Sequence, residues 1–151
     1  MELCPPGHAE HAAALSALAG GLQSTFDNTG DLTTLEESVA LHRKSLEERV
    51  PGHPLRHISL VNVGAVLEAR FHQRGDMQDL KDAVSFLREA KQLRRVDHPD
   101  RASLLQCLAG VLKLTYEQEG DVDALVEAYI SSGSLSIGCS HLRGIPFVMS
   151  I

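Results

Sequence analysis

The chain has few aromatic residues, few cysteines and no long apolar run. It contains no Trp, two Tyr and four Phe among 151 residues. A core must therefore be built from Leu, Val and Ala, which suits packing of helix on helix. The three cysteines, Cys4, Cys107 and Cys139, are widely spaced and odd in number. This excludes a disulfide framework and predicts a reducing, cytoplasmic environment.

Two further classes of partner are excluded by what the chain does not contain. There is no run of about 18 apolar residues, and no basic segment precedes a hydrophobic stretch at the N-terminus. We therefore predict neither a transmembrane helix nor a secretory signal. The formal net charge is -6 with scattered Lys and Arg, whereas binding to a phosphate backbone needs clustered basic residues. We expect no membrane and no nucleic acid among the partners.

The most informative feature present is a 45-residue period. A Pro-Gly-His turn at 6–8 returns at 51–53 and, weakened, at 97–99, while a Gly-Asp pair recurs at 30–31, 75–76 and 120–121. Apolar residues keep the same step, in the sets Leu15, Leu60, Leu105; Leu22, Leu67, Leu112; Phe26, Phe71, Tyr116; and Leu35, Leu80, Leu125. A fixed period of this size is typical of stacked supersecondary units rather than of one closed globule.

Each repeat is predicted to be a pair of antiparallel helices. In the second repeat, Pro54 suits the first position of a helix, because its missing N–H would be unpaired there anyway. Apolar residues then follow at spacings of three and four up to Phe71, which predicts one buried stripe. Gly75 is expected to end this helix, and Asp76 to cap the next. Each helix is expected to have roughly 17 residues.

One small residue recurs in the middle of the first helix of each repeat. Ala19, Gly64 and Ala109 occupy equivalent positions. Gly inside a helix costs up to about 1 kcal/mol relative to Ala. We therefore interpret this position as the point where the two helices of a pair cross most closely.

The period divides the chain and then fails. It predicts repeats at 6–50 and 51–95, a partial repeat at 96–129, and a tail without pattern at 130–151. The last helix is expected to end after Ala128, about ten residues early. Two interpretations of the tail compete, a degenerate segment that folds over the last repeat and foreign sequence from a missed splice or frame change. The shortened repeat is expected to leave a leucine stripe partly uncovered and available for self-association: Leu105, Leu108, Leu112 and Leu125.

These patterns resemble a known repeat family. The large and small residues resemble those of tetratricopeptide repeats, in the long form found in kinesin light chains and, more closely, in the arrays of mushroom-forming fungi. The residues that carry the resemblance are Leu60, Val63, Gly64, Leu67, Ala83, Leu87 and Ala90, with Gly-Asp at 30–31, Leu-Glu-Glu at 35–37 and Pro-Gly-His-Pro at 51–54. The resemblance covers about residues 6 to 129. It implies an all-α, right-handed solenoid of antiparallel helix pairs, with about two and a half repeats.

The resemblance also implies a concave groove lined by the first helix of each repeat. The positions carried over are Ala13, Ser16, Gly20, Gln23, Ser24, Ile58, Val61, Ala65, Glu68, Ala69, Ser103, Gln106, Gly110, Lys113 and Leu114. Among these, with Asn62 beside them, partner contacts are expected at Ser16, Gln23, Val61, Asn62, Glu68, Gln106 and Lys113. The Lys and Asn residues of the family's carboxylate clamp are absent from the matching positions. A groove of small, mildly apolar residues is expected to accept a helix or peptide instead.

The chain shows no pattern that predicts catalysis, a metal or a cofactor. His8, His53 and His98 share one repeat position, which favours a structural role in the turn before each pair. His53 and His57 have the spacing of a zinc pair, but no pattern supplies the remaining ligands. Cys107 lies inside a predicted helix and is interpreted as a packed residue.

We expect a non-catalytic scaffold for protein–protein interaction. Two alternatives stay open. One is a self-associating fragment. The other is the regulatory arm of a larger signalling protein or protease, since fungal arrays of this kind often precede a caspase-like CHAT domain, which these 151 residues do not resemble.

Overall fold

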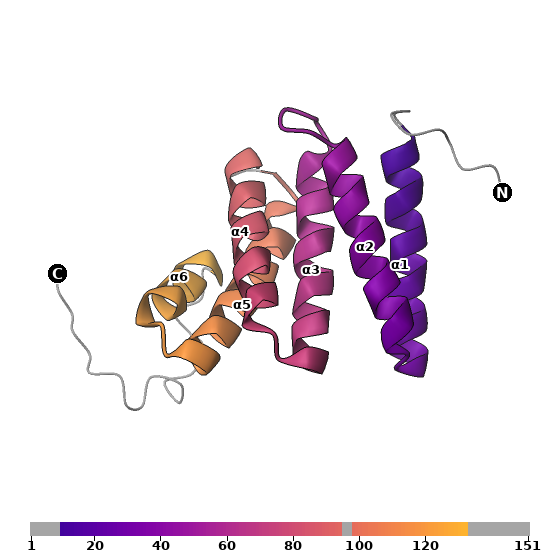
Figure 1. Cartoon of the computed structure of the whole chain (residues 1–151). Helices are drawn as coiled ribbons and strands as arrows, with labels where there is room; N and C mark the ends of the chain where they lie inside the picture. The colour runs from indigo at the N-terminus through magenta and orange to yellow at the C-terminus, as the bar shows by residue number, and fades with distance from the viewer. Residues whose placement is uncertain (1–9, 95–97, 133–151) are drawn as a thin grey trace.

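The computed structural model describes residues 10–94 and 98–132, and within these ranges it consists of helices without strands. The helices stand side by side in chain order (Figure 1). Their bounds are α1 His11–Thr29, α2 Leu32–Glu48, α3 Arg56–Arg74, α4 Met77–Leu93, α5 Arg101–Glu119 and α6 Val122–Ser132. The prediction of an all-α fold is confirmed.

Consecutive helices pack against each other, in an arrangement consistent with a helical repeat. The pairs are α1 with α2, α3 with α4, and α5 with α6. Between pairs, α3 packs against α2 and α1, and α5 packs against α4 and α3. We call the α3 contact with the first pair the first junction and the α5 contact with the second pair the second junction. The first helix of each later pair thus packs against both helices of the pair before it.

The turns inside the pairs have the chemistry that the sequence predicts. Gly75 has a φ of 69°, in the left-handed region that favours glycine, and its N–H donates to Phe71 O at 2.7 Å. Asp76 then accepts a hydrogen bond from Gln78 N at 2.9 Å through its carboxylate. The other two pairs have the same arrangement at Gly30, Asp31, Gly120 and Asp121.

The Asp76 cap provides a test of the local stability of α4. Replacing Asp76 with Ala removes the acceptor for Gln78 N and is expected to lower the free energy of unfolding by about 1 kcal/mol. Asp76→Asn keeps an acceptor oxygen and is expected to retain most of that stability. Urea denaturation monitored by circular dichroism measures both variants. Equal losses in the two variants would contradict a capping role.

A second periodic feature joins one pair to the next. The Arg56 guanidinium, at the start of α3, donates to Arg49 O at 2.8 Å at the end of α2. Arg101 repeats this contact with Arg94 O at 2.7 Å, 45 residues further on. A cation near the last carbonyls of a helix is favourable, because these carbonyls have no partner within the helix. The arginine at the start of each later pair therefore caps the C-terminal end of the second helix in the pair before it.

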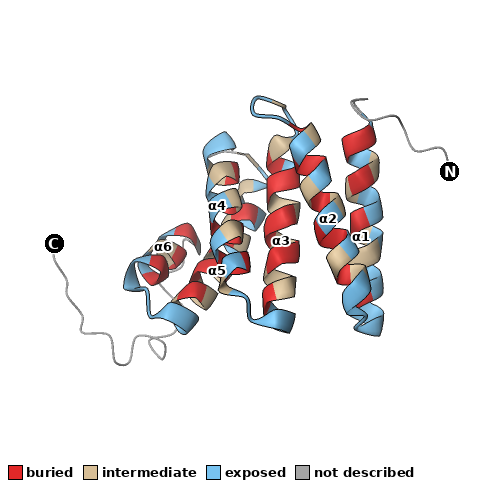
Figure 2. Cartoon of the chain, in the orientation of Figure 1, coloured by how far each residue is buried: buried red, intermediate tan, exposed pale blue. Residues whose placement is uncertain are grey.

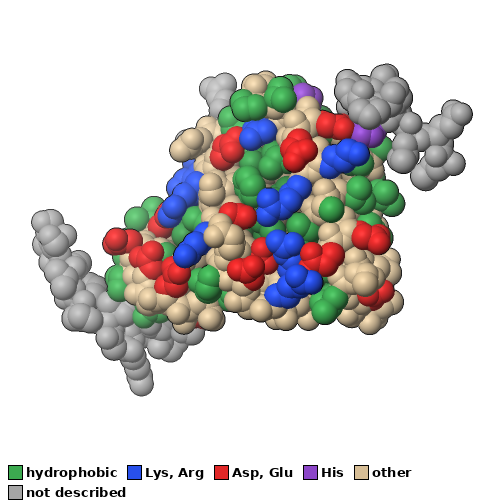
Figure 3. All heavy atoms as spheres, in the orientation of Figure 1, with side chains coloured by type: hydrophobic (Ala, Val, Ile, Leu, Met, Phe, Trp, Pro, Cys, Tyr) green, Lys and Arg blue, Asp and Glu red, His purple; other side chains and the backbone are tan. Residues whose placement is uncertain are grey.

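Ion pairs also connect the second helices of neighbouring pairs. Arg43 of α2 pairs with Asp82 of α4, and Arg88 of α4 pairs with Glu127 of α6. These contacts are again 45 residues apart. Figure 3 shows basic and acidic side chains interspersed on one face of the molecule rather than separated by sign.

The core runs through all three pairs and includes the predicted crossing point. Buried residues lie along the inner sides of the helices (Figure 2). At Gly64, an added Cβ would lie 2.8 Å from Leu87 Cγ on the partner helix α4. The interpretation of this position as a close crossing is confirmed for the second pair.

The C-terminal repeat differs from the prediction in two ways. Helix α6, Val122–Ser132, continues past Ala128 to the last residue that the structure describes. The stripe expected to be partly uncovered is largely closed, because Leu108, Leu112 and Leu125 are buried and Leu105 is half-buried. The reason is that α5 is covered by α4 on one side and α6 on another. The rest of the tail, 133–151, lies outside the described residues.

Candidate functional site

A pocket of about 190 Å³ opens between the first helices of the second and third pairs. We call it the α3–α5 pocket. Helix α3 forms one wall of the pocket, and the first turn of α5 forms the other. Arg94, which follows the last residue of α4, lies beside them. Its lining residues are His57, Ile58, Val61, Asn62, Arg94, Asp100, Ser103 and Leu104.

The most unusual group in this pocket is the imidazole of His57. The residue is only 7% exposed, yet its Nε2 atom has no hydrogen-bond partner among the residues that the structure describes. Burial lowers the pKa of His57, and the positive charge of Arg94 lowers it further. The ring is therefore neutral at pH 7, with one nitrogen that donates and one that accepts. Buried polar atoms without partners are rare in folded proteins, which makes this one a candidate contact for a bound group.

Apolar side chains surround the polar groups. Ile58 is exposed at the rim, Val61 is half-buried, and Leu104 is buried at the base of α5. Asn62 and Ser103 add hydrogen-bonding groups from the two opposite helices. An apolar pocket with a few converging polar groups has the usual composition of a binding site.

The corresponding positions at the first junction are closed by hydrogen bonds between side chains. Ser16, which stands where the second repeat has Val61, shares a hydrogen bond of 2.8 Å with Ser45 Oγ. Ser59, which stands where the third repeat has Leu104, accepts from Arg49 at 3.0 Å. The second junction replaces these serines with apolar residues, so its polar groups lack the same internal partners. The pocket is therefore a property of the second junction and not of the repeat in general.

The structure brings together two of the seven expected contact residues. Val61 and Asn62 both line the α3–α5 pocket, together with Ile58 and Ser103 from the wider predicted groove. Glu68 lies further along α3, within 3.8 Å of His72 Nε2, and burial raises the pKa of its carboxyl. Its Oε1 atom lies beside Gly110 of α5.

The other expected contacts lie elsewhere. The Ser16 hydroxyl belongs to the serine network of the first junction. Gln23 is half-buried on α1, and Gln106 is exposed on α5. Lys113 lines a different pocket, between α5 and α6, where it pairs with Glu117 at 3.9 Å. The seven residues therefore do not form one continuous site.

Sequence reasoning missed His57, Arg94, Asp100 and Leu104 as pocket residues. The sequence pattern places His57 in the buried stripe of its helix and at zinc-pair spacing from His53, and neither pattern marks it as a pocket residue. A usable signal existed in the departures from the period, since Val61 and Leu104 stand where another repeat has serine. Where one repeat has a serine and the next has an apolar residue at the same position, the two junctions are expected to differ in their hydrogen bonding.

The turn histidines have the structural role that their repetition predicts. The Leu55 N–H donates to His53 Nδ1 at 3.0 Å, and the Asp100 N–H donates to His98 Nδ1 at 3.2 Å. Both rings thus hold the turn before the next helix. His8 lies outside the described residues.

Cys107 lies inside helix α5, where the sequence predicts a packed cysteine. Cys107 is half-buried, and burial, with a further contribution from Glu68, raises the pKa of its thiol. A raised pKa leaves less thiolate and a less reactive sulfur. Within 10–94 and 98–132, no three His, Cys, Asp or Glu side chains gather as a metal site. Over the same ranges, no helix has the length and apolar content that crossing a membrane requires. Cys4 and Cys139 lie outside these ranges.

Comparison with known proteins adds no family. No family model matches the chain, and no curated protein matches it significantly. The arrangement of the helices and the α3–α5 pocket therefore provide the basis for a proposal of function.

Proposed function

We propose that this protein is a non-catalytic, cytoplasmic scaffold of the tetratricopeptide type that binds a partner protein through a helix or extended peptide. In this proposal the helix pairs form a right-handed solenoid, and the partner lies along the face formed by α1, α3 and α5. The α3–α5 pocket is the observation that carries the proposal. Its rim residue Ile58 is a large apolar side chain, yet it is 40% exposed. It lies in the same pocket as the buried His57 imidazole, whose Nε2 atom has no partner within the described ranges.

The pocket suits an apolar side chain followed by a polar group. The apolar part would pack on Ile58, Val61 and Leu104, while a hydrogen-bonding group would reach His57 Nε2. Leaving a buried polar atom unpaired costs about 1–3 kcal/mol, so a ligand that supplies the partner gains affinity. Because the imidazole is neutral at pH 7, the ligand group need not be charged.

The magnitude of the interaction requires contacts beyond one pocket. Full burial of one large apolar side chain contributes about 1.5–3 kcal/mol. A micromolar complex needs about 8 kcal/mol. The partner must therefore continue along the first helices, where Gln106 is exposed and Glu68 is partly accessible. This length requirement favours a helix or an extended peptide over a small molecule.

A peptide selection tests the proposal. Random peptides displayed on phage are selected against the 151-residue chain, and the enriched peptides are synthesised and titrated by calorimetry. Ile58→Glu places a charge on the pocket rim at an exposed position and is expected to weaken binding about tenfold or more. The matched control is Ala40→Glu, an exposed position on the second helix α2 and outside the face formed by α1, α3 and α5. It is expected to change the affinity by less than about twofold.

The outcomes separate clearly. Loss of binding in Ile58→Glu with retention in Ala40→Glu supports the pocket as the site. Equal affinity for the two variants, or no enrichment of peptides over a blank surface, would reject the proposal. Circular dichroism of each variant verifies that the helices are intact.

A further inference from the structure

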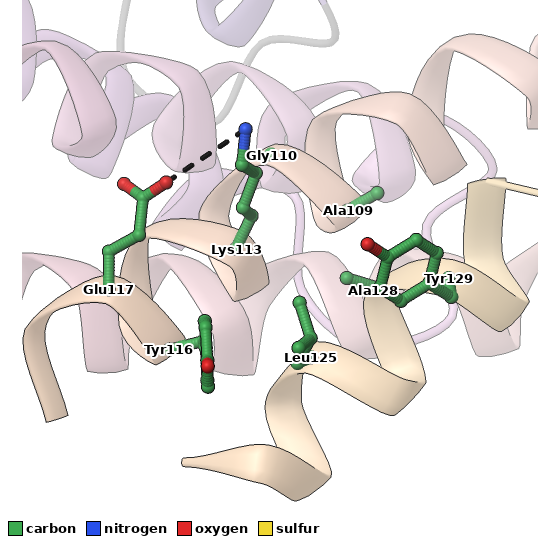
Figure 4. A pocket seen from close by; sticks show the side chains of 8 residues that line it. All are labelled: Ala109, Gly110, Lys113, Tyr116, Glu117, Leu125, Ala128 and Tyr129. Carbon is green, nitrogen blue, oxygen red and sulfur yellow. Dashed lines mark ion pairs between the residues drawn. The ribbon is translucent and has the colours of Figure 1, made fainter. Parts of the chain in front are cut away.

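A second pocket lies at the C-terminal end of the described fold, between α5 and α6 (Figure 4). We call it the α5–α6 seat. It has a volume of about 210 Å³ and a largely apolar lining. Its residues are Ala109, Gly110, Lys113, Tyr116, Glu117, Leu125, Ala128 and Tyr129. Figure 4 shows side chains from both helices on either side of the same opening.

The seat corresponds to a place that is occupied in the other two pairs. Each of its residues has a counterpart 45 positions earlier on α3 or α4, for example Gly64 for Ala109 and Leu80 for Leu125. In that earlier pair, α5 packs against both α3 and α4, and α3 packs in the same way against α1 and α2. The occupant of such a place is therefore the first helix of a pair.

The molecule has one first helix whose outer face meets no preceding pair among the described residues. Helices α3 and α5 each pack against the pair before, and on this face Val63 and Val66 of α3 and Leu108 and Val111 of α5 are buried. The equivalent positions on α1 are Leu18 and Gly21. Leu18 is 48% exposed, and a Cβ added at Gly21 would meet nothing within 4 Å. Helix α1 thus presents the face that α3 and α5 bury.

We propose that α1 of one copy docks into the α5–α6 seat of a second copy, so that molecules stack head to tail and continue the helical array. The interface is heterologous, because two different surfaces meet, and every stack keeps a free α1 face at one end and a free α5–α6 seat at the other. The docking would place Leu18 of one copy and Val126 of the other, which is 50% exposed, at the new junction.

The charges at the junctions agree with this pairing. At the first junction Glu36 pairs with Arg74 at 3.0 Å, and at the second Lys81 pairs with Glu119 at 3.4 Å. The same positions in the proposed junction hold Val126 and Thr29. Both are uncharged, so docking buries no unpaired charge at this point, which would be costly.

Sedimentation of the 151-residue chain over a wide concentration range tests the proposal. Wild type is expected to grow beyond a dimer as concentration rises, since head-to-tail contacts leave free ends. Leu18→Glu and Val126→Glu each alter an exposed position and are each expected to be monomeric. An equimolar mixture of the two retains one intact seat and one intact α1 face, and is expected to form dimers and nothing larger. Val50→Glu, at a site 58% exposed in the α2–α3 loop, is the control and is expected to assemble like wild type.

Three results would overturn the proposal. The first is a wild-type chain that stays monomeric at every concentration. The second is self-association of Leu18→Glu, because it would mean that the α5–α6 seat pairs with itself. The third is a mixture of the two variants that remains monomeric although both are folded by circular dichroism. None of these results depends on the peptide site at the α3–α5 pocket.

Discussion

Replacing Arg70 with Thr is expected to lower the free energy of unfolding by about 3–5 kcal/mol. The Arg70 guanidinium donates to both carboxylate oxygens of Asp79, at 2.9 and 2.6 Å, and to Glu36 at 3.1 Å. The hydrogen bonds to Asp79 are the main reason that the pKa of Arg70 is raised. Asp79 is only 2% exposed, so removing Arg70 leaves a buried carboxylate without its cation.

The chain itself supplies the control for this variant. At the positions of Arg70 and Asp79, the third repeat has Thr115 and Ala124. The double variant Arg70→Thr with Asp79→Ala removes both charges together and is expected to be more stable than Arg70→Thr alone, because replacing a buried pair costs less than breaking it. Chemical denaturation of the wild type, the two single variants and the double variant completes the cycle. A double variant no more stable than Arg70→Thr would contradict this explanation, because it would show that the stability lost in Arg70→Thr does not come from the unpaired Asp79 carboxylate.

Replacing Gly64 with Ala is expected to destabilise the protein by about 1–2 kcal/mol. The added Cβ would lie 2.8 Å from Leu87 Cγ and 3.0 Å from its Cδ2 atom, which forces the core apart. Overpacking of this kind costs about 1–3 kcal/mol, and the better helix propensity of Ala returns up to about 1 kcal/mol. Thermal and urea denaturation measure the net loss.

Gly20→Ala is the matched control for this prediction. Gly20 also lies inside a first helix, but a Cβ there meets nothing within 4 Å. This variant is expected to be stabilised by up to about 1 kcal/mol, since only the propensity changes. Opposite signs at Gly20 and Gly64 would establish the close crossing with Leu87. A stabilised Gly64→Ala would show that Leu87 moves aside without cost.

The part of the fold that could be predicted is the part that repeats. The helix pairs, the left-handed Gly75, the Asp76 cap and the crossing at Gly64 all follow from residues that keep the same position in each unit. Each depends on local backbone chemistry or on one small side chain, which are readable in a sequence. The prediction ends α6 too early, at Ala128, because the periodic pattern of apolar residues stops there. A helix can continue after its residues cease to match the other repeats.

The candidate site could be predicted only in part, because it depends on differences between repeats. Val61 and Asn62 were expected on the first-helix face, and they line the α3–α5 pocket. Whether a junction is closed or open depends on which side chains meet across it. Ser16 and Ser45 bond to each other at one junction, while Val61 takes the place of Ser16 at the next. Such contacts join residues far apart in the chain and require the packed structure.

The ion pairs at the two junctions have opposite order of charge, and this favours one succession of helices over another by up to about 1 kcal/mol for each exposed pair. Glu36 faces Arg74, whereas Lys81 faces Glu119. If α3 of one molecule packed against α4 of another, Arg74 would meet Lys81, and if α5 packed against α2, Glu119 would meet Glu36. Like charges at such a contact oppose the wrong pairing. Misassembly between similar units is a characteristic failure of repeat proteins, and this exchange of sign disfavours the wrong order of the pairs.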